Sequence, residues 1–117
     1  MKRFLASKLT APVAIVALGA AVLVPAAQAG RTPTVDVGSN FFAPGKVTVK
    51  KNSKVRFNWE PSGFELHDVN VRSGPKKFHS PTQAGGSYTT PKLRKPGTYK
   101  LYCKQHDDMT MKLVVKR

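Results

Sequence analysis

Three side chains with soft or borderline donor atoms lie within seven positions of one another near the end of the chain. Cys103, His106 and Met109 supply a thiol, an imidazole and a thioether, and two residues separate each donor from the next. Cys103 is the only cysteine, so an internal disulfide is excluded. A second imidazole, His67, begins a run in which valines alternate with polar residues. We therefore treat these four residues as candidate metal ligands.

The donor types favour one kind of metal ion. Two imidazoles and a thiolate, with a thioether as a weak axial ligand, are typical of copper sites that transfer electrons. Zinc prefers four strong ligands, whereas calcium and magnesium prefer oxygen ligands. His79 lies in a polar segment, where we expect no metal role. We expect Met111 to pack in the core, although it remains an alternative axial donor.

Short apolar runs with a period of two residues follow one another along the chain. They cover residues 34–37, 47–49, 55–59, 67–71, 99–103 and 109–115, and turns such as Pro44-Gly45 and Pro96-Gly97 separate them. Alternation of this kind without a helical period predicts an all-β sandwich or barrel. We expect residues 72–86 to form a loop, with at most a short strand near Phe78. The turn at 51–53 contains Asn52, which tolerates a left-handed backbone.

The same alternation indicates which way the candidate ligands point. Successive residues of a strand face opposite sides, so Cys103 shares the apolar face of Tyr99 and Leu101. By the same argument His67 and Met109 begin inward-facing rows. We expect His106 to lie in the loop between the last two strands, which brings all four donors to one end of the fold.

The first 29 residues have the three parts of a secretory signal peptide. A basic start is followed by an apolar run over residues 11–24 and by the small residues Ala27 and Ala29. The alternative is an uncleaved membrane anchor, but the run is shorter than the roughly 20 residues that span a bilayer. We expect cleavage after Ala29, export to the periplasm or the extracellular space, and no transmembrane segment in the remaining domain, residues 30–117.

The chain resembles the cupredoxins, the small type-1 copper proteins, in their plastocyanin and amicyanin branch. The resemblance spans residues 34–116 and rests on segments 42–49, 66–69 and above all 95–106, which runs Lys-Pro-Gly-Thr-Tyr into Tyr-Cys-Lys-Gln-His. It implies a Greek-key β-sandwich or barrel of about 7–8 strands. It also implies one type-1 copper ion held by four ligands, which are His67, Cys103, His106 and Met109.

The chain departs from the pattern of this family at three places. Asp68 stands where the family often has Asn, and Met111 stands where it usually has Gly. Asp107-Asp108 replaces a pair that usually contains proline, which makes the surface around His106 acidic and puts a hydrophobic docking patch in doubt.

The resemblance implies an exported carrier of single electrons between redox partners, with no substrate turnover and therefore no enzyme activity. The alternative is an extracytoplasmic copper-handling protein that buffers or delivers copper. A third reading is a metal-free β-sandwich adhesion module. The chain is too short for a large enzyme with a deep cleft.

Charge sets further expectations about partners. The chain carries 20 Lys and Arg against 6 Asp and Glu, a net charge of +14. Removal of residues 1–29 takes away three basic residues and leaves 17 − 6 = +11. This charge fits an acidic redox partner, or equally adhesion to an anionic cell envelope. We find no nucleic-acid motif, and we expect a monomer.

Overall fold

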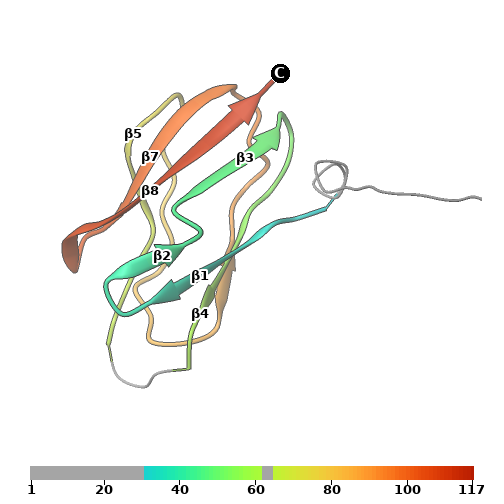
Figure 1. Cartoon of the computed structure of the whole chain (residues 1–117). Coiled ribbons are helices and arrows are strands. Elements are labelled where there is room, and N and C mark those ends of the chain that lie inside the picture. Colours follow the sequence, from blue (N-terminus) through green and yellow to red (C-terminus); the bar gives the residue numbers. More distant parts are fainter. Residues whose placement is uncertain (1–30, 62–64) are drawn as a thin grey trace, which may run out of the picture. The chain divides into compact units, whose positions relative to one another are not determined.

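The computed structural model describes residues 31–61 and 65–117. These residues form eight strands and no helix (Figure 1), so the described part of the chain has no helix that could cross a membrane. The predicted signal peptide lies outside the described residues. The strands are β1 (Thr34–Gly38), β2 (Phe41–Ala43), β3 (Lys46–Lys50), β4 (Arg56–Trp59), β5 (Asn70–Ser73), β6 (Ser87–Thr89), β7 (Gly97–Cys103) and β8 (His106–Lys116).

The eight strands form two four-stranded sheets, as the prediction of an all-β sandwich requires. One sheet has the order β2-β1-β4-β6 and the other has the order β3-β8-β7-β5. Both are mixed sheets, because β1 pairs with β4 and β3 pairs with β8 in parallel, while the other pairings are antiparallel. The described strands do not close into a barrel, so of the two predicted arrangements the sandwich is the one observed.

The predicted alternation explains the core. On β7, Tyr99, Leu101 and Cys103 are at most 1% exposed, while Lys100 between them faces the solvent. The inward row of β8 is buried in the same way, and it consists of Met109, Met111, Leu113 and Val115. The period of two residues thus carries the candidate donors Cys103 and Met109 into the interior.

Strands β2 and β6 and the run at 67–71 differ from the expectation. β6 was not expected, because Tyr88 is its only apolar residue and an edge strand with one half-buried side chain shows no alternation. The run expected at 67–71 is a strand only from Asn70 onward, and His67 makes an isolated bridge with Gln83 instead. Near Phe78, where at most a short strand was expected, there is one isolated bridge, between Asn70 and His79, in agreement with the expectation. Asn52 has a φ of 74°, as predicted.

Candidate metal centre

A tight turn between β7 and β8 brings two candidate ligands face to face. Cys103 is the last residue of β7 and pairs with His106, the first residue of β8. The expectation that His106 lies in a loop was therefore wrong, because only two residues separate the strands. Tyr102 pairs with Thr110, so residues 107–109 have no partner on β7 and form a bulge.

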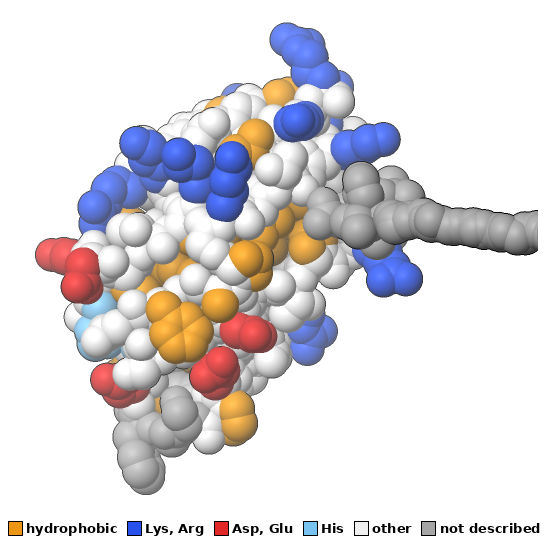
Figure 2. Space-filling view, in the orientation of Figure 1, with side chains coloured by type: hydrophobic (Ala, Val, Ile, Leu, Met, Phe, Trp, Pro, Cys, Tyr) orange, Lys and Arg blue, Asp and Glu red, His pale blue; other side chains and the backbone are white. Residues whose placement is uncertain are grey.

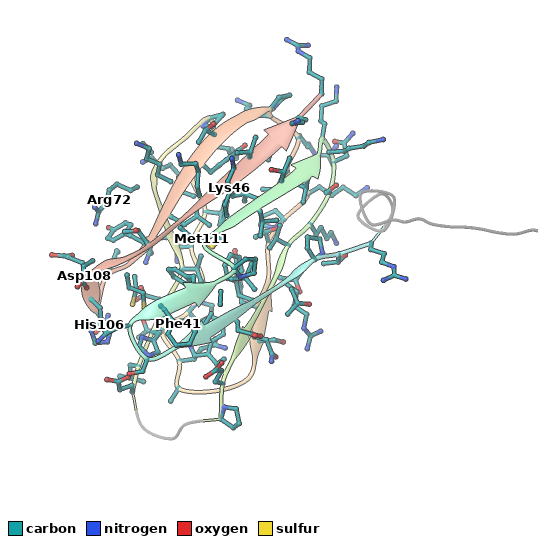
Figure 3. All side chains as sticks on the ribbon, viewed as in Figure 1. Phe41, Lys46, Arg72, His106, Asp108 and Met111 are labelled. Carbon is teal, nitrogen blue, oxygen red and sulfur yellow. The ribbon has the colours of Figure 1, made fainter. Side chains whose placement is uncertain are left out.

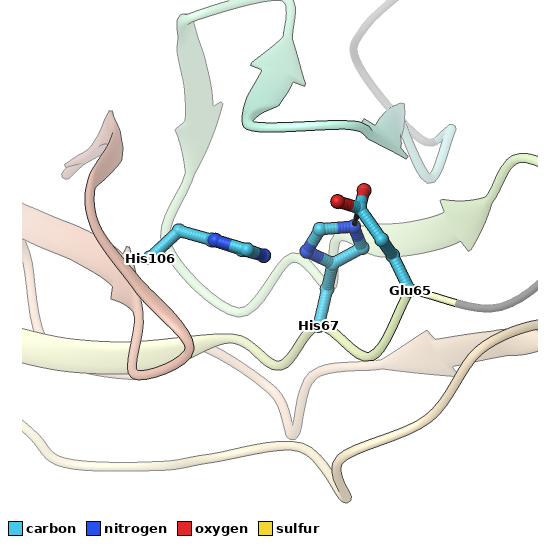
Figure 4. Close-up of side chains that lie close together, drawn as sticks. All are labelled: Glu65, His67 and His106. Carbon is cyan, nitrogen blue, oxygen red and sulfur yellow. Dashed lines mark ion pairs between the residues drawn. The ribbon is translucent and has the colours of Figure 1, made fainter.

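His67 approaches the thiol from the opposite segment. Its Nδ1 lies 3.9 Å from the Sγ of Cys103, and the ring centroids of His67 and His106 are 4.9 Å apart. His67 is 3% exposed and Cys103 is fully buried, whereas His106 is half-buried. In Figure 4 the ring of His106 points toward that of His67. The structure therefore places His67 beside both Cys103 and His106, although the donor atoms that lie within 4.8 Å of one another are those of Glu65, His67 and His106.

Met109, the fourth predicted donor, lies in the bulge and is 1% exposed. Leu101 pairs with Met111 and Tyr102 with Thr110, so continuing the same register would place Met109 opposite Cys103. Met111 is also buried, and Figure 3 shows it farther from His106 along β8. By its position along β8, Met109 is the nearer of the two methionines to the turn that carries Cys103 and His106.

Glu65 is a residue of this cluster that the sequence analysis missed. Its Oε1 lies 3.4 Å from the Nε2 of His67, and it accepts a hydrogen bond of 2.7 Å from the hydroxyl of Ser39. That hydrogen bond lowers the pKa of Glu65, and the imidazoles of His67 and His106 act in the same direction. One donor atom each from Glu65, His67 and His106 lie within 4.8 Å of one another. Its position two residues before a candidate ligand is the only signal that the sequence offers.

The orientation of His67 suits a metal bound at Nδ1. A carboxylate beside Nε2 favours the proton on that nitrogen, which leaves the lone pair of Nδ1 directed at the thiol. The backbone N–H of Asp68 donates to the Sγ of Cys103 over 3.4 Å, which helps to fix the position of the sulfur. A buried thiol, two imidazoles and a buried thioether are the soft and borderline donors that copper takes. By the chemistry of its donors, the site fits copper.

Asp68 connects the segments that carry these donors. Its Oδ1 accepts from the backbone N–H of Lys104 at 2.8 Å and from the Nδ2 of Asn70 at 2.7 Å. Its Oδ2 accepts from Thr82 at 2.9 Å and from Gln105 at 3.3 Å. Burial alone raises the pKa of Asp68, but these four hydrogen bonds outweigh burial and hold the pKa below its ordinary value. Where the family often has Asn, this chain thus has the carboxylate of Asp68, which accepts four hydrogen bonds.

The surface around His106 is both acidic and apolar. Asp107 and Asp108 are exposed next to it, and Figure 2 shows acidic side chains beside the histidine. Phe41 is 42% exposed and Leu66 is 51% exposed, and Phe41 lies near His106 in Figure 3. The acidic residues therefore have not removed apolar surface from this end.

The remaining histidine lies apart from the cluster. The Nδ1 of His79 lies 3.3 Å from the carbonyl of Ser80, and His79 bridges to Asn70. It is not among the residues that the structure groups as potential metal ligands.

A protein family and several solved structures are similar to this chain. Residues 11–115 match the model of the family described as Cupredoxin-like domain. No curated protein matches the chain. Among solved structures, the copper-containing nitrite reductase NirK from Thermus scotoductus SA-01 is 27% identical, with a TM-score of 0.66. That match covers 87% of this chain but only 25% of the reductase, so the chain spans a quarter of that protein.

Two amicyanin structures have the same fold. A mutant in the reduced Cu(I) form at pH 4 is 21% identical over 73% of this chain and 82% of its own, with a TM-score of 0.63. An oxidised mutant is 22% identical over 75% of this chain and 85% of its own, with a TM-score of 0.62.

Proposed function

The chain belongs to the cupredoxin-like domain family, and from this premise we propose that it is an exported copper protein that carries single electrons. A copper ion bound at this site would alternate between Cu(II) and Cu(I) and so accept and release one electron. The proposed ligands are His67, Cys103, His106 and Met109. The observation that supports this proposal best is the buried thiol of Cys103, which faces the Nδ1 of His67 at 3.9 Å beside His106.

Different residues of the chain would have different roles at such a site. Glu65 orients the imidazole of His67, and the N–H of Asp68 donates a hydrogen bond to the sulfur of Cys103. The sandwich excludes water from Cys103 and Met109, whereas the half-buried His106 provides a route for electrons to a partner at the surface. Because the donors come from a short turn and a braced loop, the site can keep one geometry in both oxidation states.

A visible absorption spectrum of the protein with Cu(II) tests this proposal. A thiolate bound to Cu(II) in such a site gives an intense blue colour, and we expect Cys103→Ser to abolish it. His79→Gln is the matched control, because it removes an imidazole outside the cluster and should leave the band unchanged. A Cys103→Ser protein with the same band would contradict the assignment. Rapid loss of Cu(I) to a chelator from an otherwise blue protein would favour copper handling over electron transfer.

We also propose that residues 1–29 are removed on export. The intact mass of the protein, recovered from a bacterial host that exports it, should correspond to a chain that begins at Gly30. The mass of the uncleaved chain in the same fraction would contradict this. Copper loading does not depend on the outcome, so the two proposals are tested separately.

A further inference from the structure

A pocket lined by cationic residues lies away from the candidate metal centre. It has a volume of about 270 Å³, and five of its nine lining residues are basic: Lys76, Lys77, Lys92, Arg94 and Lys95. The other four are Phe78, Pro91, Leu93 and Tyr99, and no carboxylate is among them. Tyr99 precedes Cys103 by four residues on β7, which corresponds to about 13 Å along a strand. The pocket is therefore distinct from the metal centre.

The base of this pocket is apolar and aromatic. Leu93 is 3% exposed and Tyr99 is fully buried, while Phe78 is half-buried. The rings of Phe78 and Tyr99 lie 6.3 Å apart. An apolar base below a charged rim is complementary to a molecule that has an apolar body and an anionic group.

The loops around the pocket are fixed by backbone contacts. The hydroxyl of Tyr99 donates to the carbonyl of Lys95 over 2.7 Å. Leu93 and Ser53 pair in an isolated bridge, in which the N–H of Leu93 donates to Ser53 over 2.8 Å. Gly97 has a φ of 141°, and a Cβ there would lie 2.7 Å from the ring of Pro75. The pocket is thus formed in advance of any ligand, which reduces the entropic cost of binding.

The five cations of the rim have no acidic neighbours that neutralise them. Within the described residues no ion pair joins a Lys or Arg to a carboxylate, since the one pair found is that of His67 with Glu65. Lys77 donates to the carbonyls of Val71 and Arg72. The side chains of the other four cations make no hydrogen bond to the described part of the chain, so their donors remain available to a ligand.

From these observations we propose that the pocket binds an amphipathic anion, in which a phosphate or carboxylate is joined to a small apolar body. The apolar body packs on Phe78 and Pro91, which reach the surface of the pocket, and the anionic group is held by Lys92, Arg94 and their neighbours. The volume is at the lower end of the range for small-molecule sites, which favours a single ring or a short chain. The same chemistry is found in a free metabolite-sized anion and in the headgroup of an anionic lipid.

The test is an NMR titration of protein expressed from the full chain, at constant ionic strength, with phenyl phosphate, inorganic phosphate and phenol. Phenyl phosphate should shift the amide signals of Lys77, Leu93 and Lys95 saturably. It should bind about tenfold or more tightly than either of the other probes, a difference of ~1.4 kcal/mol. Equal affinity for phenyl phosphate and inorganic phosphate, or shifts confined to other residues, would overturn the proposal.

Two double variants with the same net charge locate the site. Lys92→Gln with Arg94→Gln should weaken phenyl phosphate binding about tenfold or more, whereas Lys46→Gln with Lys116→Gln on β3 and β8 should not. Both pairs are exposed, so the melting temperature should stay close to that of the wild type and serves as the check on folding. An equal loss of phenyl phosphate affinity in both variants would mean that the total charge of the protein attracts the anion. That result would overturn the proposal that the pocket binds it.

Vesicles distinguish the two sources of the ligand. If phosphatidylglycerol vesicles bind the protein, phosphatidylcholine vesicles do not, and phenyl phosphate releases the protein, then the pocket takes a lipid headgroup. If vesicle binding is the same for the wild type and for the Lys92→Gln, Arg94→Gln variant while only the wild type binds phenyl phosphate, the pocket takes a free anion. Either result supports the site.

Discussion

Two buried methionines on β8 offer a thioether to the proposed copper site. Met109 lies in the bulge beside the turn that joins Cys103 to His106, whereas Met111 pairs with Leu101 within the regular ladder. Both side chains face inward because they are two residues apart. Met109 lies closer along β8 than Met111 to the turn that carries Cys103 and His106. We therefore propose Met109 as the thioether ligand.

We expect Met109→Leu to keep the blue colour and to raise the reduction potential. The substitution removes a weak axial donor that favours Cu(II) over Cu(I), and it leaves the trigonal ligands in place. Voltammetry of the copper-loaded protein measures the change. Met111→Leu is the control, since this swap of similar volume should cost less than about 1.5 kcal/mol of stability and leave the potential nearly unchanged. If Met111→Leu changes the reduction potential and Met109→Leu does not, Met111 is the thioether ligand instead.

At the scale of elements, alternation predicted β7 and β8 well, because each strand has one buried and one exposed face. It could not predict where their ladder shifts, since the shift depends on how Cys103 and Tyr102 pair with the neighbouring strand. The sequence therefore indicated the candidate ligands of this turn but placed His106 in a loop. For the same reason Glu65 was missed, as its contact with His67 arises in a connection and not in a periodic strand.

The segment around His67 shows a second limit of the alternation argument. If residues 67–71 had been one regular strand, Asp68 and Asn70 would have faced the solvent, yet both are at most 6% exposed. They are buried because Asp68 accepts hydrogen bonds from its neighbour Asn70 and from two other segments, at Thr82 and Lys104. A network of this kind joins parts of the chain that are distant in sequence, so no local pattern signals it.

Asp68 is therefore expected to stabilise the loops as a unit, and two substitutions separate its hydrogen bonds from its charge. Asp68→Ala removes the acceptor of the part-buried N–H of Lys104 and leaves the amide of Asn70 with only the carbonyl of Tyr102, which should lower the free energy of unfolding by roughly 1–3 kcal/mol. Asp68→Asn keeps the oxygen that accepts from both donors, and its amide can donate to Thr82, so the loss should be smaller. Urea unfolding of the copper-free protein measures both, and an equal loss would show that the carboxylate charge matters more than the network.

At the scale of the whole molecule, net charge and local charge point to different partners. The net charge of +11 that remains without residues 1–29 led us to expect an acidic redox partner or adhesion to an anionic cell envelope. The structure places Glu65, Asp107 and Asp108 at the end where His106 reaches the surface, and Figure 2 shows most Lys and Arg side chains elsewhere on the visible face. At physiological ionic strength charges are screened over about 8 Å. We therefore propose that the acidic residues decide which partners approach His106, and that the docking face of the partner is basic.

Small redox reagents of opposite charge test this proposal without a known partner. Asp107→Asn with Asp108→Asn should slow oxidation of the reduced protein by a cationic cobalt(III) complex and accelerate oxidation by ferricyanide. Two unit charges about 6 Å apart in water interact by roughly 0.7 kcal/mol, so each carboxylate should change the rate of these multiply charged reagents by at least about threefold before screening. Lys92→Gln with Arg94→Gln is the control, because it removes two charges at the distant pocket and should change both rates much less. If the control changes the rates as strongly as the aspartate variant does, net charge governs the encounter and an acidic partner is again favoured.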